Sequence, residues 1–321
     1  MTTLDLEKPL QTRDGREVTI DIVHKEDLYP IVGHMKDSWG SRKHTYASWS
    51  LQGFYDLDSD VNHELDLMNT EFENTLAIEF ETQLERVKEN ESRLQKLSFL
   101  NNKIDDCDAV MLGKALETNT MLVELDIGRN LIGNYGAQAL ARALEINSAL
   151  KKLSLYENEI GYMGAATLSS ALTNNATLMT LILGANLIGD AGAWAFANML
   201  KTNTTLVVLF LASNRIYDDG AERLAKVLKT NATLRELCLR DNRIGDCGAV
   251  ALAEALKTNT TLNKLYLSGN KIGDTGVQAL AKAMKTNTTL TELCIDKIGL
   301  HSTDIEALTE INHYLERNKN A

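Results

Sequence analysis

The residues that could do chemistry in this chain form no recognisable catalytic or metal-binding motif. Residues 56–60 (Asp-Leu-Asp-Ser-Asp) begin like a calcium-binding loop, but Val61 occupies its glycine position and Leu67 its bidentate carboxylate position. The six histidines have no metal-ligand spacing, and none accompanies a candidate nucleophile in a known motif. No glycine-rich loop is placed to hold a phosphate. We therefore predict that the chain has no catalytic residues, no metal site and no cofactor.

Cysteines and asparagines form the other patterns with chemical potential. The four cysteines include no CxxC pair, which indicates reduced thiols in a cytosol-like compartment. Asn-x-Thr, the acceptor for N-glycosylation in secreted proteins, recurs at 28-residue intervals at Asn175, Asn203, Asn231, Asn259 and Asn287. This regular spacing indicates copies of one structural turn rather than five glycosylation sites.

Composition and charge exclude several classes of partner. The net charge of -11 argues against nucleic acid or an anionic membrane as a partner, because both need a concentrated basic face. No stretch approaches the roughly 20 apolar residues that span a bilayer. The N-terminus is acidic and lacks an apolar signal core. We expect a chain without a membrane span, located in the cytoplasm or exported without a classical signal peptide.

A 28-residue repeat organises most of the chain. Each copy begins with Leu-x-x-Leu-x-apolar, as at Leu122, Leu125 and Ile127, and an asparagine follows the third of these positions. The seven asparagines are Asn102, Asn130, Asn158, Asn186, Asn214, Asn242 and Asn270. An eighth copy, which begins at Leu290, lacks the asparagine. One such unit cannot bury its own apolar face, so the repeats are expected to stack into a solenoid.

Each repeat combines two hydrophobic periods. The Leu-x-Leu alternation predicts a short strand, and alanine-rich stretches such as residues 249–256 predict a helix. We expect the aspartates at positions such as Asp190 and Asp246 to cap their own helices, and asparagine to form a left-handed turn after each helix. Strands stack about 4.8 Å apart and helices about 10 Å apart. The stack should therefore curve, with a parallel sheet on the inside.

This 28-residue unit, Leu-x-x-Leu-x-Leu-x-x-Asn followed by a helix, resembles the ribonuclease-inhibitor-like class of leucine-rich repeats. It is also similar to the repeat domains of intracellular innate sensors and of Ran GTPase-activating proteins. The resemblance covers residues 66–321 and implies an α/β fold, a right-handed leucine-rich-repeat solenoid shaped like a horseshoe. Members of this class bind unrelated partners, so the resemblance defines the fold more closely than the function.

The two ends of the chain depart from the repeat. Residues 80–87 lie in register with the helix of a preceding repeat and should form an N-terminal cap. Near the C-terminus, Ile305, Leu308, Ile311 and Leu315 form an apolar stripe that should close the stack. Residues 1–65 do not fit the repeat, and the alternation in residues 17–23 predicts a small antiparallel β module of three or four strands. This module could be a separate binding domain or an elaborate cap.

The concave face of the arc is the predicted binding surface, because its solvent-facing strand positions should be polar. Several are instead apolar or aromatic, namely Tyr156, Ile182, Val208, Phe210 and Tyr266. Charged residues are expected around them at Glu124, Asp126, Glu236, Arg240 and Asp296. Such a patch usually marks an interaction site, although the N-terminal module or another copy could also cover it. Trp194 is a second candidate on the helix side, but we expect it to pack across neighbouring helices.

The leading functional hypothesis is a non-enzymatic scaffold that binds an unknown protein on the concave face. A short solenoid without a signal peptide also resembles bacterial effectors that reach a host cytosol by non-classical export. The alternative is a GTPase-activating or other regulatory protein that resembles the Ran GTPase activator. The mixed, slightly basic C-terminus counts against this alternative, because that family usually carries a strongly acidic tail. The partner and the oligomeric state remain open at this point.

Overall fold

The computed structural model describes residues 78–296 and 302–320, with side chains from residue 306 in the second range, and the backbone of four strands within residues 10–49. The calcium-like segment 56–60 lies outside the described residues. The chain divides into two compact units, Met1–Glu73 and Asn74–Ala321. In the first unit the strands pair antiparallel in the order β1-β2-β3-β4, with bounds Leu10–Gln11, Glu17–Val23, Ile31–Met35 and Ala47–Trp49. The predicted division between residues 65 and 66 stays a prediction.

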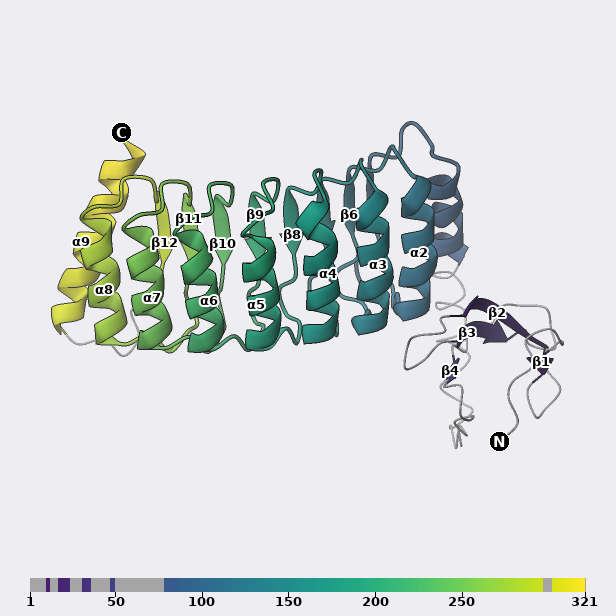
Figure 1. Cartoon of the computed structure of the whole chain (residues 1–321), viewed down its shortest axis with the longest axis horizontal. Coiled ribbons are helices and arrows are strands. Elements are labelled where there is room, and N and C mark those ends of the chain that lie inside the picture. The colour runs from purple at the N-terminus through teal and green to yellow at the C-terminus, as the bar shows by residue number, and fades with distance from the viewer. Residues whose placement is uncertain are drawn as a thin grey trace. The chain divides into compact units, whose positions relative to one another are not determined.

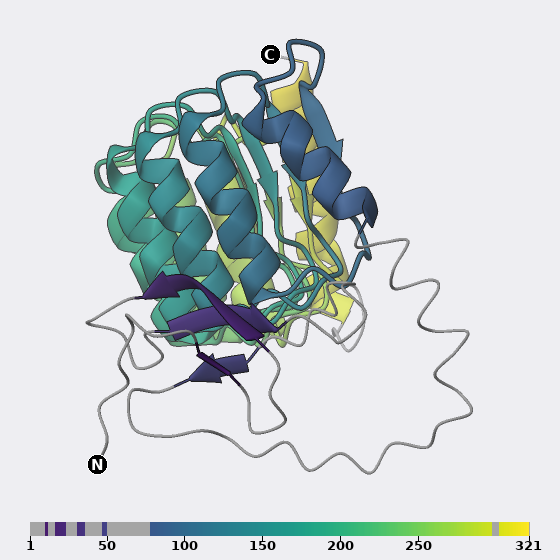
Figure 2. The same ribbon diagram turned by 90° about the vertical axis from the view of Figure 1, so that its right-hand side faces the viewer.

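The second unit alternates strands and helices after a first helix at residues 78–88. Its strands are β5 (Lys96–Ser98), β6 (Glu124–Asp126), β7 (Lys152–Ser154), β8 (Thr180–Ile182), β9 (Val208–Phe210), β10 (Glu236–Cys238), β11 (Lys264–Tyr266) and β12 (Glu292–Cys294). Its helices are α2 (Asp106–Thr118), α3 (Asn134–Ile146), α4 (Tyr162–Asn174), α5 (Gly189–Met199), α6 (Asp218–Leu228), α7 (Asp246–Leu256), α8 (Asp274–Met284) and α9 (Ser302–Lys319). The strands form one parallel sheet in sequence order, and the helices line up as a layer along it (Figures 1 and 2). The predicted α/β leucine-rich-repeat arc is confirmed in this architecture.

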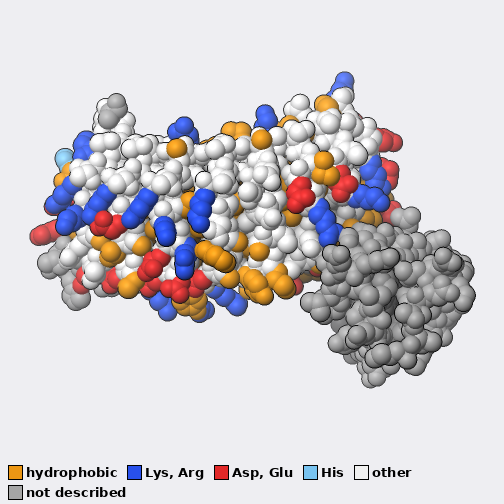
Figure 3. Space-filling view, in the orientation of Figure 1, with side chains coloured by type: hydrophobic (Ala, Val, Ile, Leu, Met, Phe, Trp, Pro, Cys, Tyr) orange, Lys and Arg blue, Asp and Glu red, His pale blue; other side chains and the backbone are white. Residues whose placement is uncertain are grey.

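The repeat leucines build the core between the two layers. Neighbouring strands pair at a 28-residue offset, as between Leu125 and Leu153, and both side chains are buried. Small residues let the helices approach one another closely. A Cβ on Gly113 of α2 would lie 2.9 Å from the backbone oxygen of Ala139 on α3, so only glycine fits at this contact between two helices. The outer face of the helices meets solvent and carries hydrophobic, basic and acidic side chains (Figure 3).

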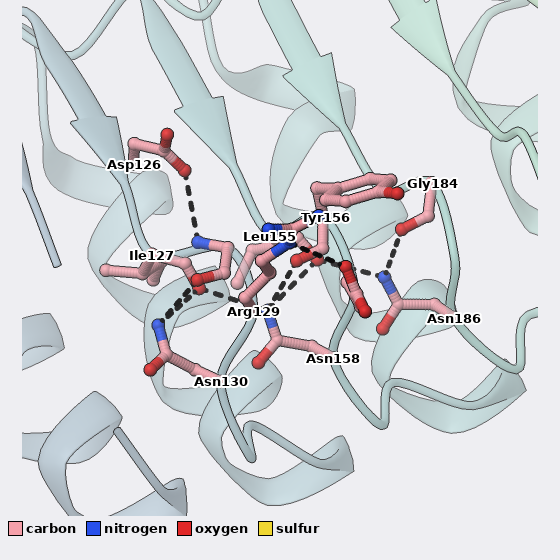
Figure 4. A network of polar contacts seen from close by, with 11 residues as sticks. Asp126, Ile127, Arg129, Asn130, Leu155, Tyr156, Asn158, Gly184 and Asn186 are labelled. Carbon is pink, nitrogen blue, oxygen red and sulfur yellow. Dashed lines mark hydrogen bonds and ion pairs between the residues drawn. The ribbon is translucent and has the colours of Figure 1, made fainter. Parts of the chain in front are cut away.

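The repeat asparagines form a ladder of hydrogen bonds along the stack. Asn130 Oδ1 accepts from the amides of Asn102 (3.0 Å) and Ile104 (2.9 Å), while its Nδ2 donates to carbonyls of its own repeat and the preceding one. Asn158 and Asn186 repeat the arrangement on successive strands (Figure 4). Each buried side chain therefore ties two repeats together through backbone groups that have no helix or strand partner.

A second asparagine column closes the helix ends and includes the five Asn-x-Thr positions. Asn147 Nδ2 donates to the carbonyls of Leu116 (2.7 Å) and Asn119 (2.9 Å), and its Oδ1 accepts from the amide of Leu150. All five Asn-x-Thr asparagines are buried, which supports their structural interpretation. The expected left-handed turn at these residues is wrong, since Asn147 has φ −65° and ψ 127°. Left-handed backbone occurs instead at the residue before a ladder asparagine, as at Arg129 (φ 54°) before Asn130.

The repeat aspartates cap the following helix rather than their own. Asp106 Oδ1 accepts from the amides of Gly133 (2.6 Å) and Gly136 (2.8 Å), which open α3. Asp218 and Asp246 make the same pair of bonds to the next helix. Our expectation of caps within one helix is therefore wrong for these residues. Within the described residues, only α2 has a side-chain cap from its own N-terminal end, which Asp105 provides. Burial raises the pKa of the Asp105 carboxyl to about 6, and the charges of Asp108 and Asp106 add to the effect.

Both ends of the stack are closed as the sequence predicts. Phe80, Leu84 and Val87 of the first helix are buried in the continuous core, and so are Leu308, Ile311 and Leu315 of α9. The side chain of Ile305 lies outside the described residues. The guanidinium of Arg317 donates to the carbonyls of Met284, Lys285 and Asn287 at the end of α8. Arg317 thus satisfies carbonyl groups that would otherwise end the stack unpaired.

Candidate protein-binding surface

The last residues of strands β8 to β11 form a row across the face of the sheet that points away from the core. Ile182 on β8 pairs with Phe210 on β9, and Cys238 on β10 separates Phe210 from Tyr266 on β11. The rings of Phe210 and Tyr266 nevertheless meet edge to face, with centroids 6.4 Å apart. Ile182, Phe210 and Tyr266 are partly exposed, whereas Cys238 is buried. The rings of Phe210 and Tyr266, which lie two strands apart, thus meet across the small residue Cys238 between them.

Val208 extends this apolar group, because residues two apart on a strand lie on the same face of the sheet. It precedes Phe210 by two residues on β9 and is also partly exposed. We call Ile182, Val208, Phe210 and Tyr266 the inner-sheet cluster. The structure thus places four of the five predicted apolar residues on three strands, β8, β9 and β11.

Tyr156 lies just beyond β7 and is the most exposed of the predicted aromatic residues, at 38%. Its ring covers Gly184 of the next repeat, where a Cβ would lie 3.1 Å from the ring carbon Cδ2 (Figure 4). Leu100 leans over Gly128 in the same way, with Cδ1 at 3.3 Å from the position of a Cβ. Tyr156 therefore borders the inner-sheet cluster on the side where the strands end.

Charged groups around Tyr266 compensate one another within the chain. Lys264 Nζ lies 3.6 Å from a carboxylate oxygen of Glu236 and 3.9 Å from one of Glu292, on the two neighbouring strands. Desolvation raises the pKa of the Tyr266 hydroxyl, and hydrogen bonds and charge from Glu236 and Glu292 raise it further. The hydroxyl therefore stays neutral and held between two carboxylates. This end of the cluster presents an aromatic ring in a polar frame.

The remaining predicted charges lie at the margins of the cluster. Lys96 lies 2.8 Å from Glu124 and lowers the pKa of that carboxyl, against a smaller opposing effect of burial. Asp126 Oδ1 accepts from the Gly128 amide at 3.1 Å, and both Glu124 and Asp126 lie on β6, two strands from Ile182. Asp296 accepts from the amide of Gly269 and closes the last repeat. Arg240 is exposed just beyond β10.

Lys264 and Glu292 are residues of this surface that the sequence analysis did not select. They occupy the same strand position as Glu236, and the alternation of charge along that position was the available signal. Among the described residues no group of three His, Cys, Asp or Glu side chains could hold a metal ion. In that same part of the chain, no helix has the length and apolar character needed to cross a membrane.

Comparisons with known proteins agree with the repeat architecture. Residues 222–321 match the family model "TMOD/LMOD Leucine-rich domain", and residues 118–141 and 202–225 match a general leucine-rich-repeat model. The chain is a leucine-rich-repeat protein. Its C-terminal third is related in sequence to the tropomodulin and leiomodin repeat domain. A comparison of the sequence with curated proteins finds no match.

Solved structures with some similarity include three repeat proteins. Leiomodin-1 Actin-Binding Site 2 is 20% identical over 75% of this chain and 90% of that one, with a TM-score of 0.29. An internalin (inlF) from Listeria monocytogenes is 21% identical over 68% and 56%, with a TM-score of 0.43. The tropomodulin C-terminal domain from Caenorhabditis elegans is 13% identical over 75% and 93%, with a TM-score of 0.31. Similarity at this level does not identify a partner for this chain.

Proposed function

We propose that this leucine-rich-repeat protein is a non-catalytic scaffold that binds another protein through the inner-sheet cluster. The observation that carries the proposal is the row of Ile182, Phe210 and Tyr266 with Val208, all partly exposed on the sheet face. Solvent-facing strand positions are ordinarily polar, so exposed apolar groups on β8, β9 and β11 indicate a surface that a partner covers. The concave curvature of a stacked repeat favours a partner that inserts into the arc.

The charges around the cluster support a partner with an apolar contact rather than a strongly charged one. Lys264 bridges Glu236 and Glu292, and Lys96 pairs with Glu124, so these groups already have counterions in the chain. Exposed ion pairs of this kind contribute little to affinity. Aromatic residues at the centre of an interface typically carry most of the binding energy. Phe210 and Tyr266 are the two side chains on which binding should depend most.

Actin is a candidate partner that can be tested directly, because one similar structure is titled as an actin-binding site of leiomodin-1. The family match also covers Tyr266 and Arg240, although it begins beyond Phe210. Co-sedimentation with actin filaments and binding to actin monomers measure whether this chain binds actin.

A GTPase-activating role has no such support, and a GTP hydrolysis assay at substoichiometric protein tests it. Location in the cytoplasm, or in a host cytosol as an effector, remains part of the hypothesis and is tested by tagged protein in cells.

The decisive experiment compares the unchanged protein with a double variant that carries both Phe210→Asp and Tyr266→Ala. Quantitative mass spectrometry of captured proteins, followed by affinity measurement with each purified candidate, should show at least about a 100-fold loss, because two hot-spot side chains contribute about 2 kcal/mol or more each. Ile146→Asp is the matched control, since Ile146 is exposed at the end of α3 on the helix side. Equal binding by a folded double variant contradicts the proposal.

A further inference from the structure

The outer faces of α4 and α5 carry no fully exposed charged side chain, unlike the outer faces of the other described helices. Their most exposed large side chains are Tyr162 (57%), Met163 (51%) and Trp194 (52%). Asp190 is the only acidic or basic residue in these two helices, and its carboxylate accepts from the amides of Tyr217 and Gly220 at the start of α6. In Figure 3 the centre of the helix layer shows hydrophobic and uncharged atoms between two charged regions.

A helix face that meets solvent ordinarily carries charged or strongly polar groups. α4 and α5 instead expose alanines around Trp194, namely Ala166 and Ala191. Half of the surface of Trp194 is exposed, so any packing across neighbouring helices covers only part of it. A large aromatic side chain in the middle of a helix, surrounded by small apolar residues, is typical of an interface centre. We call Tyr162, Met163, Ala166, Ala191 and Trp194 the outer apolar face.

The neighbouring helix α6 shows which partner fits this face. Its exposed stripe has two acidic residues near the start, Asp219 and Glu222, and two basic residues near the end, Lys226 and the C-cap residue Lys229. In the described part of the chain none of these four side chains takes part in an ion pair. Residues 219 and 229 are equally far from residue 224, and so are residues 222 and 226. An antiparallel copy of α6 would therefore place every acid opposite a base.

We propose that a second copy of this chain covers the outer apolar face, with the helices of the two copies antiparallel across a two-fold axis. Asp219 then faces Lys229 of the second copy, and Glu222 faces Lys226 of the second copy. The symmetry repeats both contacts, as it does in any isologous interface. Arg223, also exposed, lies beside the axis next to Glu222.

The same axis also brings the apolar residues together. Residue 196 on α5 lies one repeat before residue 224 on α6 and therefore at the same position along the helix direction. Trp194 is two residues from residue 196. At about 1.5 Å per residue, Trp194 lies about 3 Å along the helix from the axis, next to Trp194 of the second copy. Two curved helix layers with parallel axes touch along the helix direction, and α5 alone provides about 16 Å of contact length. The contact is confined to α4–α6 because the layers curve away on both sides.

Sedimentation velocity on the full chain tests the proposal over protein concentrations from about 1 to 100 μM. The unchanged protein should form dimers, and Trp194→Glu should weaken dimerisation by at least about 100-fold. Two charge variants are more specific: Asp219→Lys with Glu222→Lys, and Lys226→Glu with Lys229→Glu. Each gives the four stripe positions 219, 222, 226 and 229 one sign of charge and should be monomeric by itself. A mixture of the two should form heterodimers, because their charges are complementary again.

Circular dichroism shows whether each variant is folded, and Lys114→Glu on the outer face of α2 is the matched control that should dimerise normally. The α6 substitutions are all at exposed positions, so they test the interface even if Trp194→Glu impairs folding. A monomeric unchanged protein over this concentration range overturns the proposal and leaves the face to a different partner. Dimers that survive both charge variants, or a mixture that stays monomeric, overturn it as well.

Discussion

Replacement of one ladder asparagine should destabilise the repeats strongly. Asn242, only 5% exposed, accepts from the amides of Asn214 (2.9 Å) and Ile216 (3.0 Å) and donates to three carbonyls. Asn242→Ala leaves both buried amides without an acceptor, at about 1–3 kcal/mol each. The carbonyls add less, because a carbonyl oxygen has a second lone pair. We expect a loss of about 4 kcal/mol in the free energy of unfolding.

Asn102→Ala is the matched control at the end of the same ladder. Asn102 is half-buried, and its Nδ2 donates only to the Leu100 carbonyl at an exposed site, so its removal should cost about 1 kcal/mol or less. Urea denaturation gives the difference in stability. Native-state hydrogen exchange is a direct local measure, because the amides of Asn214 and Ile216 should lose protection first. Equal stability of the two variants refutes the view that the ladder stabilises neighbouring repeats through buried amides.

Three further outcomes follow from individual contacts. The folded-state pKa of Asp105 is about 6, above its unfolded value of about 4, so the stability of the first repeats should rise as pH falls from 7 to 5, and Asp105→Asn should abolish this slope in thermal unfolding. Arg317→Ala should speed hydrogen exchange in α9 about tenfold and leave the central helices unchanged, since it removes bonds to the end of α8. In a thiol titration, exposed Cys247 should react at least about tenfold faster than buried Cys238, whose pKa burial raises.

The repeat period made most of the fold predictable. A leucine pattern at a constant 28-residue step specifies strand register, helix position and direction of stacking together, so every strand of the second unit falls where the pattern predicts. The capping contacts were less accessible. Asp106 bonds to Gly133 and Gly136, 27 and 30 residues away, whereas a local reading assigns it to its own helix. A contact between repeats becomes visible only when the distance between helices is known.

The candidate site was predictable in position but not in detail. Alternation along each strand identifies the residues that face away from the core, which is why Ile182, Phe210 and Tyr266 were found. Their exposure and the closure of rings over Cys238 depend on side-chain geometry across strands. Sequence also does not show which charges are already paired, as Lys264 is with Glu236. The exposed fraction of Trp194 is also not readable from the sequence, because it depends on how small the neighbouring side chains are.

The two proposed surfaces lie on opposite layers of the repeat unit, so each can be occupied without blocking the other. A dimer through the helix layer would leave both inner-sheet clusters free and facing away from each other. Such a dimer binds two partners, and its avidity for a surface carrying many partner copies should exceed that of a monomer by about 100-fold or more. Trp194→Glu should therefore weaken binding to an immobilised, dense partner and leave one-to-one binding in solution unchanged. Surface plasmon resonance at two partner densities measures both quantities, and equal losses in the two formats would show that the surfaces are coupled.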